Sequence, residues 1–204
     1  MGTLITIVGN NGSGKTTLAH ALGRQNGYKT YLESHQDRPY QPLFSEDVRR
    51  YALPNQIDYL LRRAEQERQI RNGSHTGVQD GGLDQDFYLY TQLFHSKGFL
   101  DDEEFSLCQR TYQALRAGLP APDLIVWLRA PLQLLGARLQ ARARMIDLEQ
   151  IVTLEDLPVL EGYLEEWLSG VDSQNLFTVD VTREDGNFGQ TVEAILGRNF
   201  FGRG

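Results

Sequence analysis

The feature that most constrains this chain is the segment Gly9-Asn10-Asn11-Gly12-Ser13-Gly14-Lys15-Thr16. It fits the pattern G-x-x-x-x-G-K-[ST] completely. It also follows an apolar, β-branched run at residues 3–8 and precedes a helical segment that begins at about Lys15 and ends near Gly27. Glycines let a backbone wrap around phosphate with its N–H groups pointing inward, and a helix N-terminus favours the same anion. The segment therefore predicts a loop that binds the phosphates of a nucleotide.

Two side chains of this loop have expected roles. Lys15 should reach the β- and γ-phosphates, and the Thr16 hydroxyl should bind Mg²⁺, so ATP and Mg²⁺ are the expected cofactors. The predicted nucleotide-binding residues are Gly9, Asn10, Asn11, Gly12, Ser13, Gly14, Lys15, Thr16 and Thr17. The loop identifies a nucleotide user and not a reaction. The Asn-Lys-x-Asp segment with which GTPases read guanine is absent, and small chains with this loop are often kinases of small metabolites, with a mechanical ATPase as an alternative.

Strand-like and helix-like segments alternate along the chain. Strands are predicted at residues 3–8, 28–33, 76–80, 123–128 and 176–181. Helices are predicted at about 15–27, 55–71, 84–97, 101–117, 131–144, 153–170 and 187–196, and residues 34–46 are predicted to form a loop. This alternation predicts an α/β fold, a parallel sheet with helices on both faces, in a single domain over residues 1–204. We expect the second strand to lie next to the first.

Composition narrows the class of protein. The chain has 204 residues and a net charge of -7, which disfavours a nucleic-acid-binding protein. No apolar run approaches the length of about 18 residues that a membrane span needs, so no membrane partner is expected. The one cysteine, Cys108, cannot form an intrachain disulfide and fits a reducing compartment, so we expect a cytoplasmic protein with Cys108 buried as a small apolar side chain.

Two carboxylates are predicted at strand ends beside the phosphate loop. Glu33 ends the second strand and Asp80 ends the third. Ligands of open α/β sheets bind at the carboxyl ends of the strands. Glu33 could take the proton of an attacking hydroxyl, and Asp80 could hold Mg²⁺ or contact the substrate. Each could instead be a solvated acid at the end of a strand.

Arginine supplies 17 of the 20 basic residues, and three of them follow one another closely at Arg138, Arg142 and Arg144. Arg138 and Arg142 lie one helical turn apart on one face of the predicted helix. Arginines over a nucleotide can neutralise the charge that develops on a transferred phosphoryl group. We therefore predict a lid at about residues 138–152, with a solvated basic face as the plain alternative.

At this point the sequence resembles a known family. The matching segments occur in one order along nearly the whole chain: residues 9–16, Glu33-Ser34-His35-Gln36-Asp37-Arg38-Pro39-Tyr40, Gln56 and Arg63, residues 80–86, residues 119–128, and Arg138-x-x-x-Arg142-Ala143-Arg144. Together they look like the deoxynucleoside kinase family, nearest its bacterial deoxyadenosine/deoxyguanosine kinases. The resemblance implies transfer of the γ-phosphate of ATP to the 5′-hydroxyl of a deoxynucleoside, in nucleotide salvage, by a homodimer packed through helices.

The resemblance also implies roles for single residues. Glu33 matches the catalytic carboxylate, and the lid arginines match Arg138, Arg142 and Arg144. Around the substrate it implies a glutamine that reads the base edge by paired hydrogen bonds (Gln56), an arginine near the base (Arg63) with its acidic partner (Asp86), an aromatic ring against the base (Tyr90) and an acid at the sugar 3′-hydroxyl (Asp147). Each could also be an ordinary polar group on a helix surface, or, for Tyr90, a core ring.

One departure from the family pattern affects the chemistry. The family has Arg-Ser after the acid of the third strand, whereas this chain has Gly81-Gly82 after Asp80. The family's arginine braces the catalytic carboxylate and the reacting phosphates. Either another arginine, such as Arg38 or Arg129, takes its place, or the protein is slow, selects another acceptor or is no longer a kinase.

Three hypotheses follow. The first is a deoxynucleoside kinase that prefers purines. The second is a kinase of another small acceptor, such as a nucleoside monophosphate, which needs an extra arginine for the acceptor phosphate. The third is a nucleotide-binding regulatory or partner subunit with weakened chemistry, in which Gly81→Arg would restore activity.

Overall fold

The structure is a computed structural model, and it describes residues 1–32, 38–143, 151–184 and 186–198. Its centre is a parallel sheet in the order β2-β3-β1-β4-β5. The strands are β1 (Thr3–Gly9), β2 (Tyr28–Tyr31), β3 (Thr76–Asp80), β4 (Leu124–Arg129) and β5 (Leu176–Asp180). Because all strands run parallel, their carboxyl ends meet at one edge of the sheet, and β1, which leads into the phosphate loop, lies in the middle of that edge.

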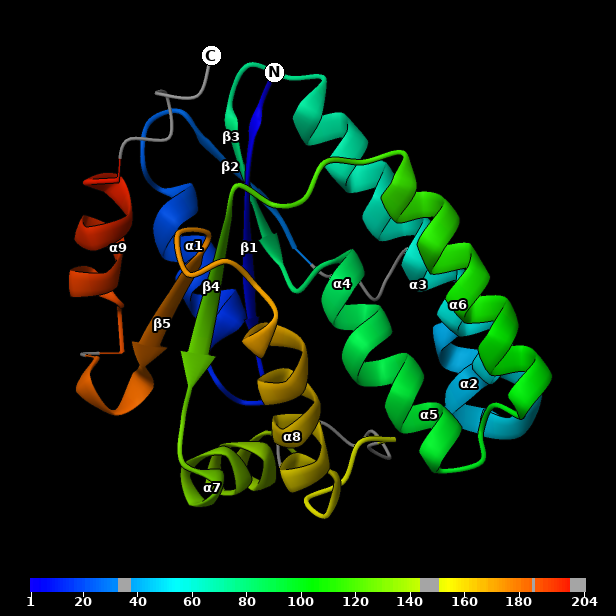
Figure 1. The fold of residues 1–204 in the computed structure, drawn as a ribbon. Helices are drawn as coiled ribbons and strands as arrows, with labels where there is room; N and C mark the ends of the chain where they lie inside the picture. Colours follow the sequence, from blue (N-terminus) through cyan, green and yellow to red (C-terminus); the bar gives the residue numbers. More distant parts are fainter. Residues whose placement is uncertain (33–37, 144–150, 185, 199–204) are drawn as a thin grey trace.

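Helices cover both faces of the sheet, as the alternation of segments predicts (Figure 1). On one face lie α1 (Lys15–Gly23) and α9 (Gly189–Leu196). The other face carries α3 (Val48–Arg71), α4 (Leu83–Gln85), the π-helix η1 (Asp86–Thr91), α5 (Gln92–Ser96), α6 (Asp102–Ala117) and α8 (Asp156–Ser169). The remaining elements are α2 (Gln41–Glu46), α7 (Leu132–Ala143) and the 3₁₀-turn η2 (Val181–Arg183).

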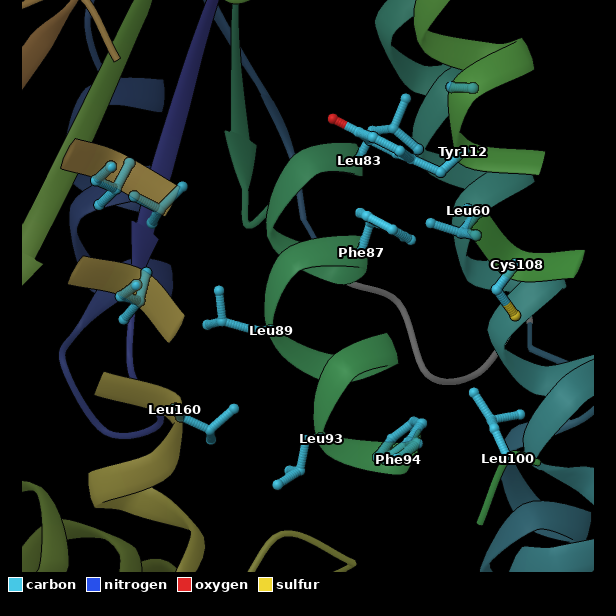
Figure 2. Packing of buried hydrophobic residues seen from close by; sticks show 14 of the residues in the cluster. Leu60, Leu83, Phe87, Leu89, Leu93, Phe94, Leu100, Cys108, Tyr112 and Leu160 are labelled. Carbon is cyan, nitrogen blue, oxygen red and sulfur yellow. The ribbon is translucent and has the colours of Figure 1, made fainter. Parts of the chain in front are cut away.

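Two hydrophobic cores lie on the two faces of the sheet. In β4, Val126 packs with the α1 side, whereas Ile125 and Trp127 pack with the α3 and α8 side. This alternation is the two-residue period of a strand that is buried on both faces. In the core on the α3 and α8 side, Phe87 points from η1 towards the helices α3 and α6, and Leu89 points to the opposite side (Figure 2). The core of this layer therefore surrounds η1.

Three expectations about the sheet and its first helices are wrong. β2 does not lie next to β1, because β3 pairs with both and stands between them. Residues 41–46, predicted as loop, form α2, which has a proline at its first turn, where no donor is lost. α3 begins before the predicted residue 55, with Asp47 as its N-cap and Pro54 inside the helix. Pro54 therefore removes one backbone donor from α3 without ending it.

The predicted helix at residues 84–97 is divided. It consists of α4, a π-helical turn over η1, and α5. π-helical turns often occur at functional sites. The next helix, α6, begins with a capping box, the pattern that Asp101-x-x-Glu104 is typical of: the Asp101 side chain accepts a hydrogen bond from the Glu104 amide (2.9 Å), and the Glu104 side chain accepts one from the Asp101 amide (3.0 Å).

Cys108 is fully buried on α6, as expected. Burial, followed by the negative charge of Glu104, raises the pKa of the thiol to about 12. Because the thiolate is the reactive form, we expect a colourless thiol reagent such as iodoacetamide to leave Cys108 unmodified at pH 8 in the native protein and to modify it fully in urea, as measured by intact mass. Free glutathione is the reactivity control. Rapid labelling of the native chain would contradict this burial.

Candidate active site

The phosphate loop connects the central strand to a helix. β1 ends at Gly9 and α1 begins at Lys15, and the turns between them face the carboxyl edge of the sheet. The Lys15 ammonium donates hydrogen bonds to the carbonyl oxygens of Gly9 (2.9 Å) and Asn10 (3.1 Å). These bonds hold the positive charge across the loop, where phosphate oxygens can replace the two carbonyls. Thr17, which is exposed, follows Thr16 on the first turn of α1.

Asn10 ties the loop to α8, the helix that follows the predicted lid. Its side chain is buried and donates from Nδ2 to the carbonyl of Leu157 (2.8 Å) and to Oε2 of Glu161 (3.2 Å), both on α8. Burial raises the pKa of Glu161, and the hydrogen bond from Asn10 only partly opposes this. The Asn10 side chain thus holds α8 against the loop.

The segment from α4 to η1 holds the other side of the loop. The buried Gln85 accepts a hydrogen bond through Oε1 from the Gly9 amide at 3.0 Å. The Tyr90 hydroxyl donates to Oδ1 of Asn11 at 2.7 Å. Tyr90, expected as the ring against the base, therefore bridges η1 and the phosphate loop. No sequence pattern indicated Gln85, because its partner is a backbone amide far away in the chain.

The two residues predicted to hold a metal ion are brought together. Thr16 Oγ1 lies 2.5 Å from Oδ2 of Asp80, which is buried at the end of β3. A hydroxyl and a carboxylate oxygen next to a phosphate loop suit Mg²⁺, which takes few protein ligands and completes its coordination with phosphates and water. No group of three or more His, Cys, Asp or Glu that could hold a metal occurs in the described part of the chain.

A buried polar cluster lies beside the loop. Arg63 on α3 is 1% exposed, and its Nε donates to Oδ2 of Asp86 at the start of η1 (2.9 Å). Gln56, two turns before Arg63, donates from Nε2 to the backbone carbonyl of Asp86 (2.9 Å). Three of the predicted base-site residues therefore converge. Buried charges of this kind need a partner and hydrogen bonds, and Asp86 supplies both.

Helix α7, in which the predicted lid begins, lies on the phosphate loop. Arg138 donates from Nη1 to the carbonyl of Gly12 at 3.0 Å, and Arg142 lies on the same helix, α7. Glu33, Arg144 and Asp147 lie outside the described residues. Lys97, which follows α5, donates a hydrogen bond to Oδ2 of Asp156 (2.7 Å) and so connects the end of α5 to the start of α8.

The space next to Asp80 is filled by Arg63. Gly81 has a φ of +73°, and a Cβ added there would lie 3.1 Å from Nη2 of Arg63. The guanidinium of Arg63 thus lies close to the point from which a side chain at position 81 would extend. An arginine at position 81 would meet both backbone strain and the like charge of Arg63.

The two other arginines considered for this role are engaged elsewhere. The buried Arg38 lies over the Tyr59 ring (3.6 Å to its centroid) and 3.6 Å from Asp58. Arg129 pairs with Glu165 at 3.0 Å and lies over the Trp127 ring. Arg63 is therefore the arginine that the described structure places against the end of β3.

A parallel sheet whose central strand leads into this loop, with a hydroxyl and a carboxylate oxygen beside it, defines a P-loop nucleotide-binding enzyme. The model of one family, deoxynucleoside kinase, matches residues 5–198. The chain belongs to the deoxynucleoside kinase family, and its activity is the ATP-dependent phosphorylation of a deoxynucleoside. This confirms the part of the first hypothesis that makes the chain a deoxynucleoside kinase.

Relatives agree in sequence and in fold. A deoxyadenosine kinase of Dictyostelium discoideum is 34% identical over 170 residues, which cover 83% of this chain and 68% of the relative. A deoxyadenosine/deoxycytidine kinase of Bacillus subtilis is 25% identical over 173 residues, 84% of this chain and 79% of the relative. The structure of deoxyadenosine kinase from M. mycoides with bound dATP has a TM-score of 0.79 at 21% identity and covers 96% of this chain and 100% of that one, so the fold is shared. Within its described residues the chain has no helix that is long and apolar enough to cross a membrane.

Proposed function

We propose that this enzyme transfers the γ-phosphate of ATP to the 5′-hydroxyl of a purine deoxynucleoside. The observation that carries the proposal is the position of the buried cluster of Gln56, Arg63 and Asp86 next to the phosphate loop, which gives a nucleoside a polar partner for its base on one side and a phosphate donor on the other. Six of the seven curated relatives are named as kinases of deoxyadenosine or of deoxyguanosine, which supports a purine preference.

The donor side is proposed as follows. The backbone of residues 9–17 surrounds the phosphates of ATP, and Lys15 exchanges its carbonyl partners for the β- and γ-phosphate oxygens. Thr16 and Asp80 would hold Mg²⁺, which neutralises charge on the phosphates when it is bound. Arg138, already against the loop, acts with Arg142 and Arg144 on the charge of the transferred group.

The acceptor side completes the proposal. Glu33, two residues beyond the end of β2, takes the proton of the 5′-hydroxyl, and Asp147 binds the 3′-hydroxyl. Gln56, Arg63 and Asp86 contact the base edge, and Tyr90 provides a ring for it. We further propose a single domain with a lid at about residues 138–152, a homodimer as the assembly and the cytoplasm as the location.

A coupled assay of ADP release with deoxyadenosine, deoxyguanosine, deoxycytidine and thymidine tests the proposal. We expect kcat/KM for a purine deoxynucleoside to exceed that for thymidine by about tenfold or more, because the polar cluster suits a base edge of defined donors and acceptors. Reactions without acceptor and with dAMP are the controls. ADP release no faster than without acceptor, for all four nucleosides and with ATP bound, would contradict the proposal, and turnover of dAMP alone would favour a monophosphate kinase.

A further inference from the structure

Three buried groups meet at one backbone carbonyl in the base cluster. The carbonyl oxygen of Asp86 accepts hydrogen bonds from Gln56 Nε2 (2.9 Å) and from Thr91 Oγ1 (3.1 Å). Gln56 Nε2 also lies 2.8 Å from Thr91 Oγ1. Gln56 is 2% exposed and Thr91 is fully buried, so water does not compete for these bonds.

The chemistry of these atoms fixes the orientation of the Gln56 amide. A backbone carbonyl can only accept, so Gln56 must turn its NH₂ group, and not its oxygen, towards Asp86. The single hydroxyl hydrogen of Thr91 is donated to the same carbonyl, so Thr91 Oγ1 accepts the second N–H of Gln56. Both N–H groups of Gln56 are therefore used inside the protein.

The π-helical turn is what allows this arrangement. Thr91 lies five residues after Asp86, at the other end of η1, and its hydroxyl returns to the Asp86 carbonyl. In an α-helix, a threonine hydroxyl reaches the carbonyl three or four residues earlier. The wider turn thus brings Thr91 to the carbonyl of the residue whose side chain binds Arg63.

We propose that Thr91 is a positioning residue that sets base specificity by fixing Gln56 so that this amide offers only its oxygen, Oε1, to the substrate. The described part of the chain contains no group that donates to Oε1. Gln56 then reads an N–H group of the base edge, such as the amino group of adenine, and does not donate to a neighbouring ring nitrogen. The inference rests on the proposed function, since it deepens the role of the base cluster. Instead of the expected pair of hydrogen bonds to the base edge, Gln56 would accept a single hydrogen bond from the base.

The decisive experiment is a double-mutant cycle between Thr91→Val and Gln56→Ala. Valine keeps the shape of Thr91 but cannot accept the Gln56 N–H. We expect Thr91→Val to raise KM for deoxyadenosine by about tenfold with kcat changed less than about threefold, and Thr91→Ser to restore KM. In the Gln56→Ala background Thr91→Val should change KM by less than about twofold, because the group through which Thr91 acts is gone.

A substrate pair reads the same contact. Purine 2′-deoxyriboside lacks the 6-amino group of deoxyadenosine. The ratio of the two Kd values, measured by calorimetry, therefore reports how much the hydrogen bond from this amino group to Gln56 contributes to binding. We expect Thr91→Val to reduce this ratio to the value of Gln56→Ala. Thr111→Val is the matched control, since Thr111 also donates to a helix carbonyl (Leu107, 2.8 Å) but lies on the surface of α6, and it should leave the ratio unchanged.

Either of two results would overturn the inference: an unchanged ratio in Thr91→Val, or an equal rise of KM in both backgrounds. Thermal unfolding of each variant identifies a merely structural loss, and Thr91→Ala provides a second truncation if valine impairs folding. Binding measured by calorimetry does not depend on turnover. An enzyme that binds deoxyadenosine but phosphorylates no nucleoside would therefore refute the proposed function while the Thr91 cycle still gives its own answer.

Discussion

Replacing Lys15 by methionine is expected to lower kcat by about 10³-fold, because a preorganised charge aimed at the transferred phosphate is typically worth that much. In the structure the Lys15 ammonium is held by the carbonyls of Gly9 and Asn10, at the point where the β- and γ-phosphates are proposed to bind. Methionine keeps the length and the apolar stem and removes the charge. The measurement is single-turnover phosphorylation of deoxyadenosine at saturating ATP.

The matched control is Lys29→Met, because Lys29 lies on the exposed edge strand β2, with its ammonium 5.4 Å from the Tyr31 ring centroid. This variant should retain kcat. A Lys15→Met enzyme that keeps more than about a tenth of the wild-type kcat would show that the loop backbone and the lid arginines neutralise the phosphates without this lysine.

Gly81→Arg is expected to impair the enzyme and not to restore a missing function. An arginine at a φ of +73° carries backbone strain of about 1–3 kcal/mol. Its Cβ would also lie 3.1 Å from Nη2 of Arg63, so the guanidinium of Arg63 would have to shift, and we expect the added positive charge to compete with it for Asp86. Breaking a buried charge pair costs about 3–5 kcal/mol, and we therefore expect kcat/KM for deoxyadenosine to fall by about a hundredfold or more.

Gly98→Arg separates strain from crowding. Gly98 has a similar φ of +69°, but nothing lies within 4 Å of an added Cβ, and the residue is exposed after α5. This variant should lose some thermal stability and keep its activity. If Gly81→Arg were as active as Gly98→Arg, or more active than wild type, Arg63 would not be the group that fills the place of the family's arginine.

Much of the architecture can be predicted from the sequence, because it depends on local patterns. The run at residues 3–8, the glycine loop and the alternation of strands and helices define the α/β fold, and Asp101 and Glu104 mark the start of α6 correctly. The order of the strands could not be predicted in this way. It depends on which strands pair across long distances, and β3 rather than β2 pairs with β1.

In the candidate site, too, the features that depend on local patterns could be predicted, and those that depend on distant partners could not. Thr16 and Asp80 could be paired in advance, since both follow strand ends at the carboxyl edge, and the structure places them 2.5 Å apart. The π-helical turn could not be foreseen, because it depends on a tertiary partner, Gln56, that binds the Asp86 carbonyl from another helix. Thr91 was missed for this reason: its hydroxyl acts on a carbonyl five residues away, a distance that matches no helical period.

The central position of β1 has a consequence for how the enzyme folds. The first strand of the chain obtains its neighbours only when Thr3 pairs with Thr76 and Ile5 with Leu124. Closing such long loops costs entropy before any contact repays it, so the chain has a high contact order and should fold slowly for its size. The phosphate loop is an extension of β1, and its binding geometry arises only with the finished sheet. Nucleotide therefore acts as a ligand of the folded state alone, and cellular ATP shifts the folding equilibrium towards the active enzyme.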